Sequence, residues 1–174
     1  NEGWTLAKVT LGNERVSLSS GGALWGLGPT GEDLLDLVRA AGGTTDSHLR
    51  QRLARLHTIE EILRLIRLRT VSAKIRGEQP GPEASIRKVL ADEHGQAVMK
   101  LAKDLAGSGA LLTDVGPLGA DVDTWHYGYL FSRALTIGGG TGEVQRNILA
   151  ERVLGLPHDT DVEAGKTWAE ARRG

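Results

Sequence analysis

The residues best suited to hold a ligand are three consecutive glycines, Gly138 to Gly140, followed directly by Thr141. Glycine has no side chain, so a ligand can approach its backbone closely. The apolar spacing that follows predicts a helix from Thr141 to Leu154, with the Thr141 hydroxyl capping its first turn. The free amides of that turn and the positive end of the helix dipole favour a negatively charged or electron-rich ligand. A glycine-rich loop is a weak signal by itself, and a flexible turn that only precedes a helix is the alternative.

The longer stretch around this turn carries a more specific pattern. Residues Leu135 to Pro157, LTIGGGTGEVQRNILAERVLGLP, resemble the end of the acyl-CoA dehydrogenase family, in its actinobacterial branch. In that family a Glu-Gly-Thr turn precedes a helix that reads roughly (E/Q)-(I/V)-Q-R-(N/L)-I. One position departs from the pattern, because the family's usual catalytic glutamate falls on Gly139. Weaker similarity covers most of the chain, with moderate matches at Glu14 to Val16 and Pro80 to Lys88.

The resemblance implies a fold and a domain organisation. We expect an all-α fold, an antiparallel four-helix bundle like the acyl-CoA dehydrogenase C-terminal domain, with an extra short helix and a polar tail. The bundle would comprise residues 1–157 and the tail residues 158–174. Complete members carry an N-terminal helical domain and a small β-domain before the bundle, and both are expected to be absent from this chain. The 174 residues alone are therefore expected to bind little FAD and to be inactive.

The resemblance also implies a reaction. In this family a carboxylate removes the α-proton of an acyl-CoA thioester while a hydride moves from the β-carbon to FAD. The base must sit in an apolar site, where desolvation raises its basicity. Gly139 cannot be that base, but some members carry it on the first bundle helix, at the position that matches Glu14.

Further site residues are implied in the same way. Thr141 and Glu143 match positions that contact FAD, whereas Gln145 and Arg50 are weaker candidates for flavin contacts. Gly140 matches a position whose backbone lies near the substrate. The implied partners are acyl-CoA, other acyl-CoA dehydrogenase subunits in a homo- or hetero-oligomer, and electron-transfer flavoprotein as a candidate electron acceptor.

Two alternatives to a catalytic subunit remain open. A non-catalytic partner subunit would explain the glycine at position 139, and a helical oligomerisation module would need no ligand at all. For Arg146, we favour a structural ion pair over a functional role. The run Asp92-Glu93-His94 is not expected to hold a metal, because neighbouring helical positions do not share one face.

Apolar spacing predicts the remaining helices. We expect them over residues 2–27, 32–41, 46–76 and 82–106, with Thr45 or Asp46 capping the third. The apolar stripe of that third helix is wide, which indicates that more than one of its faces is buried. Residues 107–123 are predicted to be irregular. Aromatic residues that follow either pack under this loop or form a wall beside a cofactor ring or acyl chain: Trp125, Tyr127, Tyr129 and Phe131.

Composition excludes several classes of function. A net charge of −1 gives no electrostatic case for nucleic-acid or membrane-surface binding. The absence of cysteine excludes disulfides and thiol chemistry and fits a cytoplasmic protein. No apolar run approaches the roughly 20 residues that cross a bilayer, so no membrane span is expected.

Overall fold

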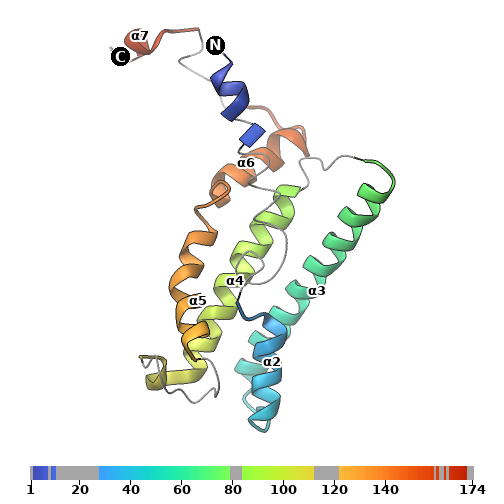
Figure 1. Cartoon of the computed structure of the whole chain (residues 1–174), viewed down its shortest axis with the longest axis vertical. Helices are drawn as coiled ribbons and strands as arrows, with labels where there is room; N and C mark the ends of the chain where they lie inside the picture. The colour runs from blue at the N-terminus through green and yellow to red at the C-terminus, as the bar shows by residue number, and fades with distance from the viewer. Residues whose placement is uncertain are drawn as a thin grey trace.

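The computed structural model describes residues 2–7, 9–10, 28–78, 84–111, 122–158, 160, 163 and 165–171. Figure 1 shows their arrangement, in which every regular element is helical. Residues 3–7 and 9–10 are helical and precede the labelled elements. The labelled helices are α2 (Gly31–Ala40), α3 (Ser47–Ile75), α4 (Ala84–Ala106), the 3₁₀ helix η1 (Gly107–Leu111), α5 (Val122–Leu135), α6 (Gly142–Arg152) and α7 (Trp168–Ala171). The expectation of an all-α fold is confirmed.

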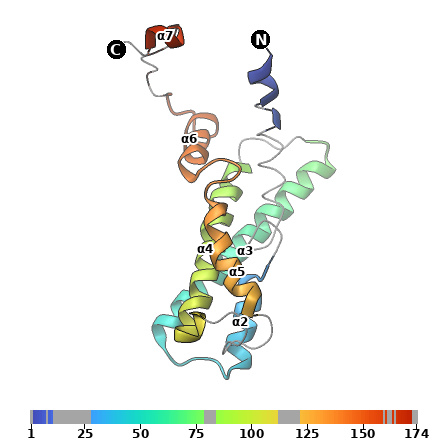
Figure 2. The same cartoon turned by 60° about the vertical axis from the view of Figure 1, so that its left-hand side comes forward.

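The helix α4 is the centre of the bundle. It packs against α3, α5 and α6, and α2 contacts both α3 and α4. Figures 1 and 2 show α3, α4 and α5 running alternately up and down the long axis of the molecule, as in an antiparallel bundle. The core between them is built from buried apolar side chains, each of which contributes on the order of 1.5–3 kcal/mol when fully buried. These are Leu34, Leu53, Leu56, Val98, Met99, Leu101, Ala102, Trp125 and Leu135.

Side-chain caps begin both α2 and α3. The Asp46 carboxylate accepts a hydrogen bond of 2.9 Å from the backbone N–H of His48, so the predicted cap of α3 is confirmed. At the start of α2, Thr30 and Asp33 form a reciprocal capping box. Such a cap contributes about 1 kcal/mol by satisfying amides that have no partner within the helix. The four helices predicted after residue 28 are present, with ends within two residues of those expected.

Two sequence expectations need correction. Residues Gly107–Leu111 form a 3₁₀ helix, and Val122–Leu135 form α5, a helix that the apolar pattern did not predict. The buried positions of α5 are Trp125, Gly128, Ser132 and Leu135, which have helical spacing. Gly128 and Ser132 are small and not strongly apolar, so a search for large apolar residues misses this row of buried positions. Small residues let α5 approach α4 closely, and Trp125 joins the core while Tyr127 stacks on Phe131 nearer the surface.

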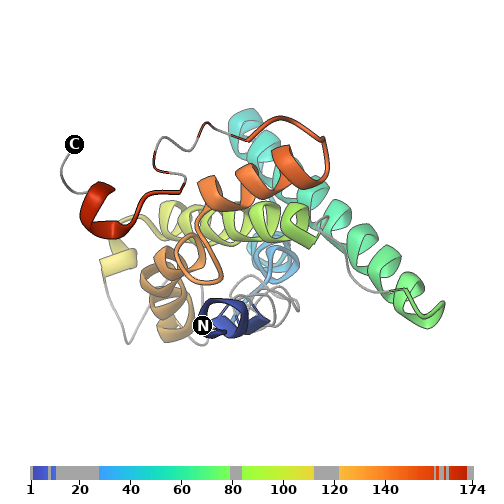
Figure 3. The same ribbon diagram turned by 90° about the horizontal axis from the view of Figure 1, so that it is seen from above.

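The second half of α3 differs from its first half. Leu53 and Leu56 are buried, but large apolar residues farther along remain exposed, including Leu65 at 56%, Leu68 at 51% and Ile75 at 81%. Figures 1 and 3 show this end of α3 leaving the other helices. The expectation that several faces of this helix are buried is therefore not met within the single chain. Across the described ranges, no helix combines the length and apolar character that a membrane crossing requires.

Candidate functional site: the glycine turn between α5 and α6

The glycine turn, residues 136–141, connects the end of α5 to the start of α6. Gly139 and Gly140 have φ angles of 69° and 95°, which side chains rarely tolerate. A Cβ atom on Gly140 would lie 2.6 Å from Nε2 of Gln145, so a larger residue does not fit there without movement. Thr141 caps α6, accepting a 3.4 Å hydrogen bond from the N–H of Val144. The predicted cap is confirmed, and both glycines are required by the shape of the backbone.

Helix α4 holds the first half of the turn through two polar side chains. Lys88 is fully buried, pairs with Asp92 one helical turn away, and donates a 3.0 Å hydrogen bond to the carbonyl of Leu135. This carbonyl lies at the end of α5, where no intrahelical partner exists. Gln96 donates from its amide to the carbonyl of Ser132 and to the hydroxyl of Thr136, at 3.1 Å each. The last turn of α5 is thereby tied to α4.

Sequence reasoning missed this pair of anchors. The signal that could have found them is their spacing, since Lys88, Asp92 and Gln96 recur every four residues in the helix predicted over 82–106. Residues at this spacing share a face. An acid and a base at that spacing read equally well as a solvated surface pair, so only the packing of α5 on α4 shows that they are buried.

Gln145 holds the second half of the turn from inside. It is 1% exposed, and its side-chain amide donates a 2.8 Å hydrogen bond to the carbonyl of Gly139. The amide oxygen has no hydrogen-bond partner among the residues that the structure describes. The side chain expected to contact flavin therefore lies within the turn, where it sets the position of the Gly139 peptide.

Outside the turn, Glu143 and Arg146 face solvent. The pKa of the Glu143 carboxyl is lowered, because this carboxyl accepts hydrogen bonds from the Glu143 backbone N–H and from the Thr141 hydroxyl. The nearby charge of Arg146 lowers it further. The ionised Glu143 carboxylate offsets the positive end of the α6 dipole, so the turn suits a neutral or hydrogen-bond-donating group better than a phosphate. Arg146 forms an ion pair with Glu93 on α4, which confirms the structural role that we favoured. Figure 3 shows α6 lying along α4, the arrangement that brings these two residues together.

Arg50, another predicted site residue, does not join this turn within the chain. Arg50 lies in the first turn of α3, and Figure 1 shows that α3 begins at the end of the bundle opposite to α6. Glu14 lies outside the described residues. The three consecutive polar residues of α4 have separate surroundings: Asp92 pairs with Lys88, Glu93 with Arg146, and His94 faces α3. Within the ranges that the structure covers, no group of three metal-ligating side chains comes together.

Comparisons with known proteins identify the family. A family model described as acyl-CoA dehydrogenase, C-terminal domain, matches residues 1–154. The chain is 32% identical over 158 residues to acyl-CoA dehydrogenase FadE34 of Mycobacterium tuberculosis, covering 90% of this chain and 20% of that protein. It is 35% identical over 158 residues to acyl-CoA dehydrogenase IpdE1 of Mycolicibacterium smegmatis, covering 91% and 38%. The chain thus spans a fifth to two fifths of these relatives' lengths.

Solved structures show the same fold. The Tcur3481-Tcur3483 steroid ACAD matches with a TM-score of 0.71 at 24% identity, covering 90% of this chain and 40% of that one. The ChsE4-ChsE5 complex from Mycobacterium tuberculosis matches with a TM-score of 0.65 at 29% identity, covering 90% and 42%. The family match extends through the glycine turn and the capped helix that follows it. The chain therefore belongs to the acyl-CoA dehydrogenase family and corresponds to the C-terminal domain of that family.

Proposed function

We propose that this chain is the part of an FAD-dependent acyl-CoA dehydrogenase that contributes one edge of the flavin and substrate site for α,β-dehydrogenation of an acyl-CoA thioester. The observation that carries the proposal is the glycine turn, which α4 and α6 hold in one conformation. Gly139 is buried and Gly140 is partly exposed, and the outer face of the turn carries Thr141 and Glu143. A planar ring can approach the Gly140 backbone closely because no side chain projects from that residue.

The residues of the turn have distinct proposed roles. FAD, when bound, supplies the acceptor for the hydride that leaves the substrate. Thr141 and Glu143 provide the polar edge that contacts the cofactor, and the Gly140 backbone lies beside the substrate. Gln145 is proposed to position these groups, because its hydrogen bond to the buried Gly139 carbonyl fixes the conformation of the turn. Preorganised backbone groups of this kind need no rearrangement when charge develops on a bound thioester.

The proposed base is Glu14, because the position of the usual glutamate holds Gly139. A carboxylate in an apolar site gains basicity from desolvation, as removal of an α-proton requires. Arg50 is proposed to contact flavin from a neighbouring subunit, since it lies at the opposite end of the bundle from the turn. Electron-transfer flavoprotein is the proposed electron acceptor.

We also propose that the chain works in an oligomer with other acyl-CoA dehydrogenase subunits. The exposed apolar residues of α3, among them Leu65, Leu68 and Ile75, form a surface of the type that protein partners cover. The ChsE4-ChsE5 neighbour is itself a complex of two different chains. A hetero-oligomer would also accommodate the second candidate function, a non-catalytic partner subunit, which the glycine at position 139 favours.

The test uses the complete gene product that contains this chain, purified with any acyl-CoA dehydrogenase subunit encoded beside it. Flavin absorbance establishes whether FAD is bound, and anaerobic addition of acyl-CoA bleaches the flavin if dehydrogenation occurs. We expect Glu14→Gln to bind FAD normally but to lose bleaching, whereas Glu2→Gln, an exposed acid on the same N-terminal segment, should behave as the wild type.

Three results would redirect this proposal. Equal bleaching of the wild type and Glu14→Gln would show that Glu14 is not the base. If flavin is bound but bleaches only through a base on the other subunit, the chain is the non-catalytic partner. A preparation without flavin in any assembly would support the oligomerisation module instead.

A further inference from the structure

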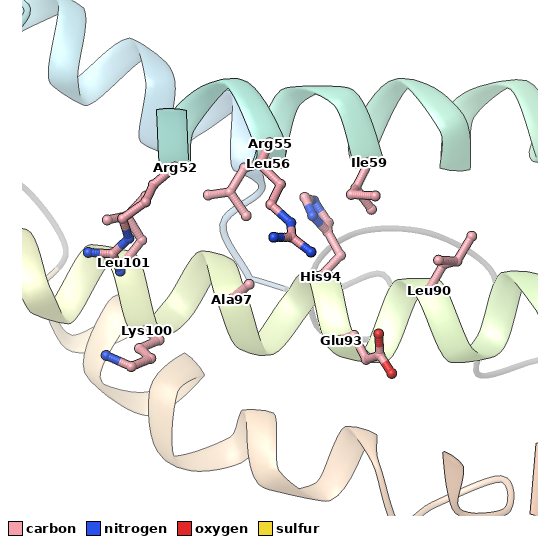
Figure 4. Close-up of a pocket in the computed structure, with 10 residues that line it drawn as sticks. All are labelled: Arg52, Arg55, Leu56, Ile59, Leu90, Glu93, His94, Ala97, Lys100 and Leu101. Carbon is pink, nitrogen blue, oxygen red and sulfur yellow. The ribbon is translucent and has the colours of Figure 1, made fainter. Parts of the chain in front are cut away.

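A cavity of 320 Å³ lies between α3 and α4, on the face of α4 turned away from α5 and the glycine turn. Its volume is at the lower end of the range of small-molecule sites, about 300–1,000 Å³. Figure 4 shows the two helices forming opposite walls, with Leu56 and Ile59 on α3 and Leu90 and Leu101 on α4 supplying an apolar lining. The described residues with proposed roles in dehydrogenation, namely Arg50, Gly140, Thr141, Glu143 and Gln145, do not line this cavity.

One buried polar side chain in this cavity has no partner. His94 is 7% exposed, and neither of its ring nitrogens makes a hydrogen bond in the described part of the chain. The Glu60 carboxylate faces this ring, with its Oε2 4.0 Å from Nε2, beyond hydrogen-bonding distance, and that oxygen also has no hydrogen-bond partner among the described residues. Figure 4 shows the ring projecting from α4 toward α3, between Arg55 and Ile59. Because buried polar groups in folded proteins are nearly always hydrogen-bonded, an unpaired imidazole in a cavity indicates a missing partner.

The charges around the cavity also leave one group unmatched. Arg52 and Lys100 both bind Asp104, and Glu93 binds Arg146. Arg55 is different, since it has neither an ion pair nor a hydrogen bond with any described residue. Arg55 is solvent-exposed and lines the same cavity as His94 (Figure 4). The cavity thus presents one unpaired cation, one unpaired imidazole and an apolar wall.

His94 adds no positive charge to the cavity near neutral pH. Burial lowers the pKa of His94 to about 4, so the ring is neutral and offers one N–H donor and one acceptor. Among the residues that line the cavity, Arg55 is therefore the cation that has no ion pair with a described residue. A monoanion matches one guanidinium, whereas a phosphate dianion would need further cations that are already engaged.

We propose that the cavity between α3 and α4 binds a small carboxylic acid with a compact apolar body. The carboxylate would lie on the Arg55 guanidinium, whose planar fork matches the two oxygens. The His94 ring would donate to one of these oxygens, and the hydrocarbon body would contact Leu56, Ile59 and Leu90. Such a ligand satisfies the unpaired polar groups and fills the apolar lining at the same time.

The test titrates hexanoate into the ¹⁵N-labelled 174-residue protein and follows backbone amides and the His94 ring nitrogens by NMR. We expect saturable shifts at residues 52–59 and 90–101, together with a shift of the His94 ring signals. Hexanamide, which is uncharged but of similar size, should bind at least roughly tenfold more weakly because it cannot pair with Arg55. Inorganic phosphate is the probe for a site that recognises charge alone.

Three variants make the test specific. Arg55→Gln should weaken hexanoate binding roughly tenfold and leave hexanamide binding unchanged. Arg69→Gln removes the same charge from the same helix outside the cavity and should have no effect. His94→Phe keeps a ring of similar width without nitrogens and should also weaken hexanoate, with a thermal melt confirming that it folds.

Several outcomes would overturn the proposal. Equal affinity for hexanoate and hexanamide, or no effect of Arg55→Gln, would show an apolar crevice without carboxylate recognition. Tighter binding of phosphate than of hexanoate would assign the site to a different anion. Shifts that do not saturate would mean that no site exists in this cavity.

Discussion

Polar side chains are buried on two faces of α4, and the two faces differ in whether these side chains are hydrogen-bonded. On the face toward α5, Lys88 is paired with Asp92 and bonded to the Leu135 carbonyl. On the face toward α3, His94 is also buried but has no hydrogen bond within the described residues. A satisfied buried network specifies one arrangement of the groups that it joins, whereas an unsatisfied one leaves a free-energy cost that a ligand can remove. The first face therefore positions the glycine turn, and the second is suited to binding.

The largest predicted effect comes from replacing Lys88, which makes the ion pair and the hydrogen bond on the face of α4 toward α5. Lys88→Met removes the cation that pairs with the buried Asp92 and the donor that binds the Leu135 carbonyl, so we expect a loss of about 3–5 kcal/mol in the free energy of unfolding. Urea denaturation measures it. Lys100→Met is the control, because Lys100 lies on the same helix in an exposed pair with Asp104 and should cost less than about 1 kcal/mol. Equal losses of unfolding free energy in the two variants would contradict the expected difference between the buried and the exposed ion pair.

The second prediction concerns the stability that is lost at acid pH because of His94, which lies on the face of α4 toward α3. The folded pKa of His94 is about 4 and its ordinary value is 6.5. Between these pH values the unfolded chain binds a proton that the folded chain does not, so stability is lost as pH falls from 6.5 toward 4. The loss attributable to His94 should approach about 3 kcal/mol. Urea denaturation across this pH range measures it.

Other groups near His94 bear on the control for that experiment. Burial, and next the charge of Glu32, raise the pKa of Glu60, which gives a contribution of opposite sign at the acid end of the range. Arg55 stays charged throughout. His94→Gln should remove most of the pH slope between 6.5 and 4 while leaving the Glu60 contribution in place. An unchanged slope in this variant would mean that other groups cause the acid sensitivity.

The third prediction tests whether the Gln145 amide leaves room for a side chain at position 140. Gly140→Ala places a methyl group at a φ of 95° and against the Gln145 amide, so we expect a loss of about 2–3 kcal/mol. Gly42 has the same φ of 95° but open space around it, which makes Gly42→Ala a matched control for backbone strain alone. It should cost about 1–2 kcal/mol. Thermal melts compare them, and no excess loss at Gly140 would mean that Gln145 can move aside.

The smallest effect is expected at the exposed link between α6 and α4. Arg146 and Glu93 have side chains more than half exposed, so their ion pair should contribute less than about 1 kcal/mol. A double-mutant cycle with Arg146→Ala and Glu93→Ala measures the coupling, which should weaken further at high salt. A coupling as large as that between Lys88 and Asp92 would show that burial does not distinguish the two links.

The sequence alone determined the elements whose signals are local. The caps at Asp46 and Thr141 and the helices that follow them depend on residues within a few positions of one another, and they are found where expected. The resemblance carried by residues 135–157 also led to the correct family. The proposed roles of Glu14, Arg50, Thr141, Glu143 and Gly140 remain predictions, because they concern ligands and neighbouring subunits.

Only the tertiary structure decided which polar residues are buried and what they meet. The backbone carbonyls that Lys88 and Gln96 bind lie on α5, 47 and 36 residues away along the chain, and α5 itself packs through small residues that carry little local signal. Gln145 turned inward because the positive φ at Gly139 and Gly140 brings the Gly139 carbonyl within its reach. His94 and Arg55 share a cavity because α3 and α4 pack side by side. Burial and pairing arise from contacts between distant segments, so no local pattern distinguishes the satisfied face of α4 from the unsatisfied one.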